Sequence, residues 1–149
     1  MKNKIITLMI VLLLSLFAKS QLIYNGQSFA FVGPMIHFNI GNGQTKVSLG
    51  VEASYWRVIE VNSVLAGADL GIDYEFGTNK LRIYTEAQAG SGIGLSLGPV
   101  LEIQDGQHSF GAQGSAWIAL LGGVDLRWRK TDHHYIAPGL MFKLPLTKL

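Results

Sequence analysis

The amino-acid sequence predicts an all-β domain in which about eight antiparallel strands close into an up-and-down barrel. The first observation is that residues 45–56 and 63–76 alternate between apolar and polar side chains. A period of two is typical of strands with one apolar and one polar face. The second is that the 18 glycines are spread through the alternating segments, which disfavours helix. The third is that short, turn-like connections separate the segments, as they do between antiparallel neighbours.

The N-terminal residues have the pattern of a secretory signal peptide. Lys2 and Lys4 supply positive charge, residues 5–17 form an apolar run, and residues 18–20 fit a small-residue cleavage site. A single transmembrane anchor is the alternative, but the run is shorter than a comfortable membrane-spanning helix. We therefore expect residues 1–20 to be a cleaved signal peptide and residues 21–149 to be an exported mature domain.

Charge and cysteine content exclude several classes of function. Without Lys2, Lys4 and Lys19, the 12 basic residues fall to 9 against 10 acidic ones, so the mature domain has a net charge near −1. Nucleic-acid binding needs a basic surface, and none is indicated. The chain has no cysteine, which excludes disulfides, a thiol nucleophile and a CxxC metal site. We expect no nucleic-acid partner and no cofactor.

The extended segments follow one another after residues 21–27. They cover approximately residues 28–38, 45–56, 63–76, 80–89, 93–103, 109–120, 124–129 and 135–144. The first segment is the least clear because both its faces are apolar, with Ile36 and Phe38 on one face and Met35 and His37 on the other.

Connections between these segments are hairpin-like. Pairing Ala89 with Ile93 leaves a glycine-bearing loop of three residues, and pairing Leu120 with Val124 leaves another. We expect further connections at residues 39–44, 58–61, 77–79, 104–107 and 130–132. Strands joined in this way form a meander, and closing the meander into a barrel removes exposed edges.

Three prolines fall within the predicted strands, each beside a glycine, at residues 33–34, 98–99 and 138–139. Each proline removes one hydrogen-bond donor from a strand ladder. We expect the prolines to face outward and the glycines to mark bulges or bends.

The polar face has the composition of a closed interior. It combines glycine, serine and glutamine with Tyr84, Trp117 and Tyr135, whereas a water-facing surface is rich in lysine and glutamate. Its charges, with Lys143 among them, nearly cancel, as buried charges must. We expect an interior charge network made of Lys46, Glu52, Asp69, Asp73, Glu75, Lys80, Arg82, Glu86, Glu102, Asp125, Arg127 and Arg129.

The apolar face carries aromatic residues at the segment ends and aliphatic residues in the middles. Aromatic girdles around an apolar band are typical of membrane barrels, although aromatic residues also favour strands in general. If the first strand starts on the periplasmic side, the membrane-interface aromatics near the outer rim are Phe38, Tyr74, Phe76, Phe110 and Trp128. Those near the inner rim are Tyr55 and Phe142.

With this pattern the chain resembles the small eight-stranded outer-membrane β-barrel proteins of Gram-negative bacteria. The resemblance covers essentially the whole mature region and is one of pattern, without a family-specific motif. It implies a transmembrane barrel in contact with outer-membrane lipid and inserted by the barrel-assembly machinery. The resemblance also implies a last strand that ends on an aromatic residue. Here residues 143–149 follow Phe142 as a tail.

Motifs for catalysis or metal binding are weak. Residues 90–98 are rich in glycine, but the spacing is not GxGxxG and no helix follows. His133 and His134 are adjacent, so on a strand they point to opposite faces, and no third metal ligand is evident. An outer-membrane lipid hydrolase would need a serine and a carboxylate beside His108 or His134, and strand parity places neither there.

Acidic and basic residues meet near the predicted outer rim. Parity places Arg82 opposite Asp73 or Glu75, and Arg127 and Arg129 reach the same level. This cluster is either a gate with a small polar site or a salt-bridged plug. We favour the plug, because an eight-stranded barrel has room only for side chains.

The sequence therefore predicts a non-catalytic, closed outer-membrane barrel with a structural or surface-interaction role. The main alternative is a soluble exported barrel that binds a small apolar ligand inside, as lipocalins do. The two interpretations differ in where they place four apolar residues, which lie inside a soluble barrel and face lipid in a membrane barrel: Val51, Leu70, Ile83 and Leu101.

Overall fold

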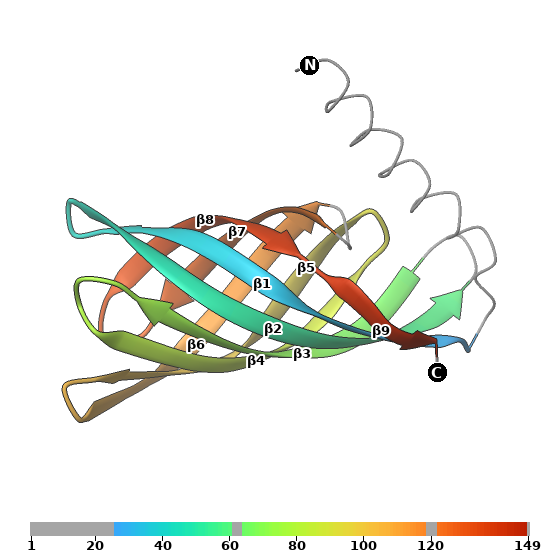
Figure 1. The fold of residues 1–149 in the computed structure, drawn as a ribbon, viewed down its shortest axis with the longest axis horizontal. Helices are drawn as coiled ribbons and strands as arrows, with labels where there is room; N and C mark the ends of the chain where they lie inside the picture. The colour runs from blue at the N-terminus through green and yellow to red at the C-terminus, as the bar shows by residue number, and fades with distance from the viewer. Residues whose placement is uncertain (1–25, 61–63, 119–121, 149) are drawn as a thin grey trace, which may run out of the picture.

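The structure is a computed structural model that describes residues 26–60, 64–118 and 122–148 (Figure 1). The predicted signal peptide, residues 1–20, lies outside the described residues. Regular structure in the described ranges is entirely β-strand. No helix within them has the length and hydropathy needed to cross a membrane.

The described strands form one continuous antiparallel sheet that closes on itself (Figure 1). They are β1 (Ser28–Gly41), β2 (Gln44–Glu60), β3 (Val64–Glu75), β4 (Lys80–Gly90), β5 (Ile93–Gln104), β6 (Gln107–Ile118), β7 (Gly122–Lys130), β8 (His134–Phe142) and β9 (Leu144–Lys148). Each strand pairs with its neighbour in sequence order from β1 to β8. Both β8 and β9 then pair with β1, so together they act as the eighth strand of the barrel. The predicted fold class and up-and-down order are confirmed.

The strand that closes the barrel differs from the prediction. Residues 144–148 are not a free tail, because β9 pairs with the start of β1 from Phe29 to Val32. The break between β8 and β9 lies where β1 carries Pro34, which has no N–H to donate. Beside it, the carbonyl of Phe142 approaches Gly33 so closely that a Cβ there would lie 1.6 Å from the oxygen.

Bulges are absent from the described strand pairs at the three glycine and proline sites, so of the predicted bulges or bends the bulges are wrong. On both sides of Pro99 the pairing of β4 with β5 keeps one register, from Tyr84↔Val100 to Ala87↔Leu97. A proline deletes a hydrogen bond but inserts no extra residue, so the ladder is interrupted without a shift. Register shifts occur instead between Val58 and Glu60 in β2 and between Ala30 and Phe31 in β1.

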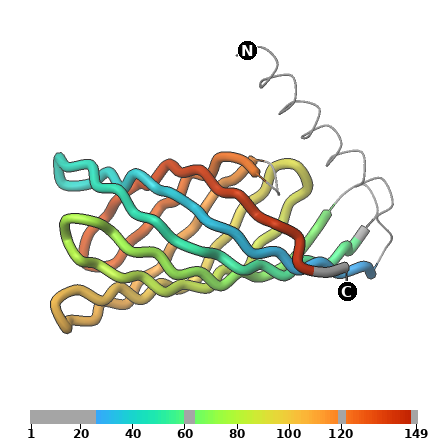
Figure 2. Tube along the Cα trace, in the orientation of Figure 1, coloured from blue at the N-terminus to red at the C-terminus, as the bar shows by residue number. Residues whose placement is uncertain are grey.

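Two hairpin turns are tighter than predicted. Asn42 and Gly43 alone connect β1 to β2, and Asp105 and Gly106 alone connect β5 to β6. All four residues have positive φ angles, as type I′ turns require. These turns and the β3–β4 turn lie together at what we call the hairpin end of the barrel (Figure 2). The described chain begins and finishes at the opposite, terminal end.

Candidate functional site

The inside of the barrel is charged and the outside is apolar. Along β7, for example, Asp125, Arg127 and Arg129 are buried, whereas Leu126 and Trp128 between them are about half exposed. The same alternation runs through β3 and β4. Because neighbouring strands pair in register, residues of one parity form a continuous inner face.

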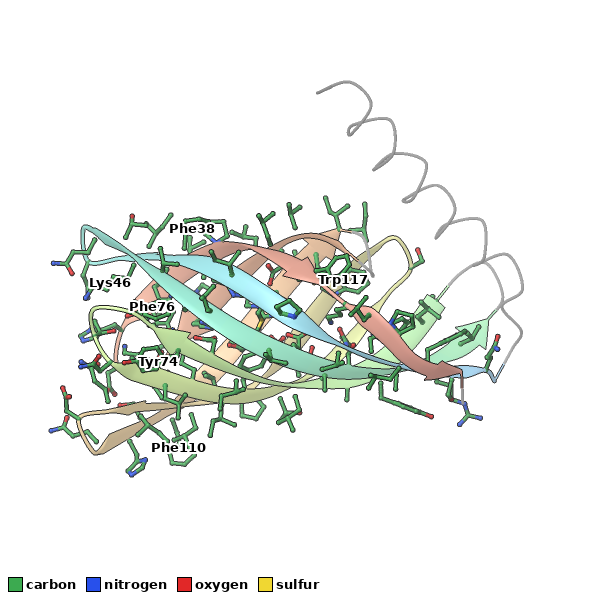
Figure 3. The ribbon with its side chains drawn as sticks, in the orientation of Figure 1. Phe38, Lys46, Tyr74, Phe76, Phe110 and Trp117 are labelled. Atoms are coloured by element: carbon green, nitrogen blue, oxygen red, sulfur yellow. The ribbon has the colours of Figure 1, made fainter. Side chains whose placement is uncertain are left out.

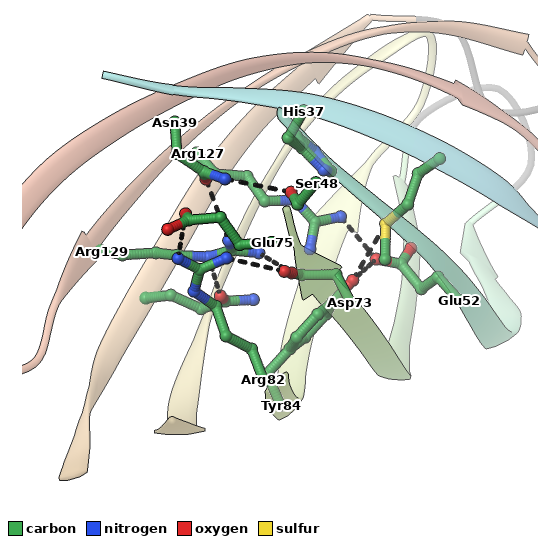
Figure 4. Close-up of polar contacts among 12 residues, drawn as sticks. His37, Asn39, Ser48, Glu52, Asp73, Glu75, Arg82, Tyr84, Arg127 and Arg129 are labelled. Atoms are coloured by element: carbon green, nitrogen blue, oxygen red, sulfur yellow. Dashed lines mark hydrogen bonds and ion pairs between the residues drawn. The ribbon is translucent and has the colours of Figure 1, made fainter. Parts of the chain in front are cut away.

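A network of ion pairs fills the hairpin half of the interior (Figure 4). Arg82 on β4 contacts three carboxylates, those of Asp73 at 2.9 Å, Glu75 at 2.5 Å and Glu102 at 2.8 Å. Arg129 on β7 reaches across the lumen to Asp73 at 2.6 Å. The sequence left open whether Arg82 faces Asp73 or Glu75; the register pairs it with Asp73, and its guanidinium contacts both.

A second group of ion pairs is centred on Arg127. Its guanidinium contacts Asp125 at 2.7 Å and Glu52 on the far side of the lumen at 2.5 Å. Glu52 also contacts Lys143, which was expected on this face but not in the network. Asp125 in turn contacts His37 at 2.9 Å. Strands β1, β2, β7 and the segment after β8 are thus joined through their side chains.

Three members of the predicted network form no ion pair in the described part of the chain: Asp69 and Glu86, which lie deep in the barrel, and Lys46. Lys46 lies half-buried at the hairpin end of β2 (Figure 3). Lys80 is at a similar level but pairs with Glu102 at 3.0 Å. Tyr135 and Thr131 donate further hydrogen bonds to Glu102. Glu102 therefore has several basic and hydroxyl partners, whereas Lys46 has no acidic partner among the described residues.

Several interior residues were not predicted. His37 and Asn39 were missed because both faces of the first segment are apolar, so its parity carries little information. Tyr84 was placed on the polar face, but its hydrogen bond to Glu52 at 2.9 Å was not foreseen. Gln113, which accepts a hydrogen bond from Arg129 at 2.6 Å, was likewise recognisable only by parity.

Inward glycines make room for these large side chains. A Cβ added to Gly71 would lie 2.1 Å from the Tyr84 ring. A Cβ on Gly139 would lie 2.2 Å from the His37 imidazole. The high glycine content of the strands thus compensates for bulky residues in a narrow lumen.

Aromatic and apolar side chains fill the terminal half of the interior. Trp56 and Trp117 form an edge-to-face pair with ring centroids 5.4 Å apart, and both are buried. Phe31, Met35 and Met141 belong to the same buried cluster. The lumen therefore contains an ion-paired half and an aromatic half, and side chains occupy both.

On the outside, large apolar side chains form a continuous surface. All seven predicted interface aromatics point outward with between 37% and 77% of their surface exposed: Phe38, Tyr55, Tyr74, Phe76, Phe110, Trp128 and Phe142. Figure 3 shows Phe38, Tyr74, Phe76 and Phe110 towards the hairpin end. Val51, Leu70 and Ile83 are also exposed, and Leu101 pairs with Ile83 on the same face. This arrangement contradicts the soluble lipocalin-like interpretation, which places these residues inside.

No hydrogen-bonded serine, histidine and carboxylate group is present in the part of the chain that the structure describes. His108 and His134 are exposed near the hairpin end. Ser109 hydrogen-bonds to Asp132, and no hydrogen bond links a histidine to this pair among the described residues. His134 contacts the Trp128 ring instead, with centroids 6.3 Å apart.

Removing the Arg82 guanidinium should destabilise the barrel strongly. The variant Arg82→Gln leaves Asp73, Glu75 and Glu102 short of a buried partner, which typically costs about 3–5 kcal/mol. We expect a loss of that size in the free energy of unfolding, measured by urea titration in lipid vesicles. Lys46→Gln is the matched control and should change stability by less than about 0.5 kcal/mol. Equal effects of the two substitutions would contradict the network.

Comparisons with known proteins found similarity to solved structures alone. No protein-family model matches the chain, and no curated protein sequence matches it. A de novo designed transmembrane β-barrel is 11% identical over 82% of this chain and 98% of its own, with a TM-score of 0.48. Ail, the attachment invasion locus protein of Yersinia pestis, is 12% identical over 81% of this chain and 100% of its own, with a TM-score of 0.45. Neisserial surface protein A is 12% identical over 78% of this chain and 97% of its own, with a TM-score of 0.42.

The assignment of the fold rests on the strand pairing, the closure and the polarity described above. The chain is a closed, antiparallel, up-and-down β-barrel with a charged interior and an apolar exterior, the fold class of transmembrane barrels.

Proposed function

We propose that this chain is a small outer-membrane β-barrel protein with a closed lumen, no catalytic role, and a structural or surface-interaction role. The observation that carries the proposal is the inverted polarity of the barrel. Leu70, Leu95 and Leu97, at 59–67% exposure, belong to a band of aliphatic residues around the outside. Ion-paired side chains lie inside, in the hairpin half of the barrel. Water would penalise such an exterior, whereas the hydrocarbon core of a bilayer favours it.

Closure of the barrel supports the same location. In hydrocarbon every backbone N–H and C=O needs a partner within the protein, and a closed barrel leaves no free edge. Four interface aromatics, Phe38, Tyr74, Phe76 and Phe110, lie towards the hairpin end, at the level where an outward-facing surface would begin (Figure 3). Under this proposal the hairpin end faces the outside of the cell and the terminal end faces the periplasm.

The proposed partners follow from this placement. Lipid contacts the apolar band, and the barrel-assembly machinery inserts the chain after export by the signal peptide at residues 1–20. Outward-facing Phe142 is followed along the closing strand by Leu144 and Leu146, which are also exposed. The apolar outer face thus continues beyond Phe142 along β9. Two-residue turns leave little surface for a large partner, which favours a structural role over a receptor role.

Cysteine labelling tests the location, because the native chain has no cysteine. In intact cells, Leu70→Cys should resist a membrane-impermeant maleimide although the side chain is 59% exposed in the structure, since lipid covers it. Gln107→Cys, exposed at the hairpin end, should react. Both variants should fractionate with the outer membrane. Recovery in the soluble periplasm without detergent, or equal labelling at the two sites, would exclude the proposal.

Planar-bilayer recording tests the closed lumen. Because ion pairs occupy one half of the interior and Trp56 and Trp117 the other, the purified protein should insert without producing steady ion-conducting steps. Insertion is verified separately by the mobility shift of the folded barrel on unheated gels. Steady conductance steps from verified insertions would refute the closed barrel and favour a gated pore.

A further inference from the structure

Three carboxylates meet in the middle of the barrel, between the ion-paired half and the aromatic half. Glu52 on β2, Asp69 on β3 and Glu86 on β4 come from adjacent strands, and one oxygen of each lies within 4.8 Å of the others. All three residues are buried, with 3%, 5% and 1% of their surface exposed. Like charges this close repel each other strongly in an interior unless a cation compensates them.

Among the described residues, only one member of this cluster forms ion pairs with basic side chains. Glu52 pairs with Arg127 and Lys143. Asp69 forms no ion pair among the described residues, and the bond that its carboxylate accepts comes from the backbone N–H of Glu86 at 3.1 Å. Neither carboxylate oxygen of Glu86 has a hydrogen-bond partner in the described structure. Asp69 and Glu86 are also direct cross-strand partners, an arrangement that destabilises a sheet when both are charged.

The charge balance of the described interior points to the same pair. Five carboxylates form ion pairs with five basic side chains, so that part of the network is neutral when His37 is neutral. The acidic members of the ion pairs are Glu52, Asp73, Glu75, Glu102 and Asp125, and the basic members are Lys80, Arg82, Arg127, Arg129 and Lys143. Asp69 and Glu86 remain, and when both are ionised they require two positive charges.

An independent observation lies next to this pair. Ser54 is 4% exposed, and its buried hydroxyl has no hydrogen-bond partner in the described structure. It is the direct cross-strand partner of Asp69 and faces inward with it. A buried hydroxyl without a partner is unfavourable. A cation bound beside the two carboxylates would take the oxygen of this hydroxyl as a further ligand.

We propose that Glu52, Asp69, Glu86 and Ser54 bind a hard divalent cation inside the barrel, with Ca²⁺ as the first candidate. Oxygen ligands surround Ca²⁺ at about 2.3–2.6 Å, so two ligands on opposite sides of one ion are up to about 5 Å apart. The observed carboxylate spacing fits this range. A bound Ca²⁺ supplies the two missing charges and tolerates the irregular geometry of three strands better than Mg²⁺ does. Because the ligands come from three strands, the ion binds the folded barrel and stabilises it.

Calcium titration of the refolded full chain in detergent micelles tests this proposal. After treatment with a chelator, the protein should bind about one equivalent of Ca²⁺ by calorimetry, and its thermal midpoint should rise on adding Ca²⁺. The double variant Asp69→Asn/Glu86→Gln should lose both responses. It should also unfold at a higher temperature than the chelator-treated native protein, because the repulsion is gone.

Two further variants separate the site from general effects on folding. Glu75→Gln changes a buried carboxylate on the same strand as Asp69 but outside the cluster, so it should retain one equivalent of Ca²⁺. Ser54→Ala removes no charge, and we expect it to lower the affinity for Ca²⁺ by about tenfold or more.

Other results would overturn the proposal. These are the absence of Ca²⁺ and Mg²⁺ binding by the native protein at millimolar concentration, or unchanged binding by the double variant. A thermal midpoint that responds to pH but not to the cation would assign the compensation to protons shared by Asp69 and Glu86.

Discussion

Pairing of charges across a closed lumen is the interaction on which the rest of this structure depends. Closure satisfies the backbone, but it also encloses the side chains of one parity, and the charged ones among the described residues are mostly buried. Arg127 on β7 reaches Glu52 on β2, and Arg129 reaches Asp73 on β3, so the ion pairs connect opposite walls. Removing one partner of such a pair leaves the other charge buried without compensation. The loss in the free energy of unfolding is then far larger than for a surface ion pair.

The same constraint explains the composition of the strands. An interior that holds three arginines and two tryptophans needs small residues opposite them, and Gly71, Gly94 and Gly139 stand where a side chain would collide with a ring. The exterior has no such limit, and aliphatic residues cover it. The inward glycines and the outward leucines are thus two consequences of one closed sheet. In these strands the glycines do not mark turns, and the leucines do not mark helices.

Most of the fold could be predicted because strand parity is a local property. Alternation in residues 64–76 and 80–89 gave the correct inner and outer faces without any knowledge of partners. Contacts across the lumen could not be predicted, because they depend on the stagger at which the sheet closes. Hence the pairing of Arg127 with Glu52, the position of His37, and the continuation of the chain into β9 came only from the structure.

Tryptophan fluorescence tests the central claim, inverted polarity in a bilayer, most directly. The chain has three tryptophans; Trp56 and Trp117 are buried inside the barrel, and Trp128 is 43% exposed outside. In vesicles with brominated acyl chains, the native protein should be partly quenched. Trp128→Phe should remove most of that quenching, and Trp117→Phe should leave it. Quenching that survives Trp128→Phe, or native fluorescence that brominated lipid does not change, would contradict the account.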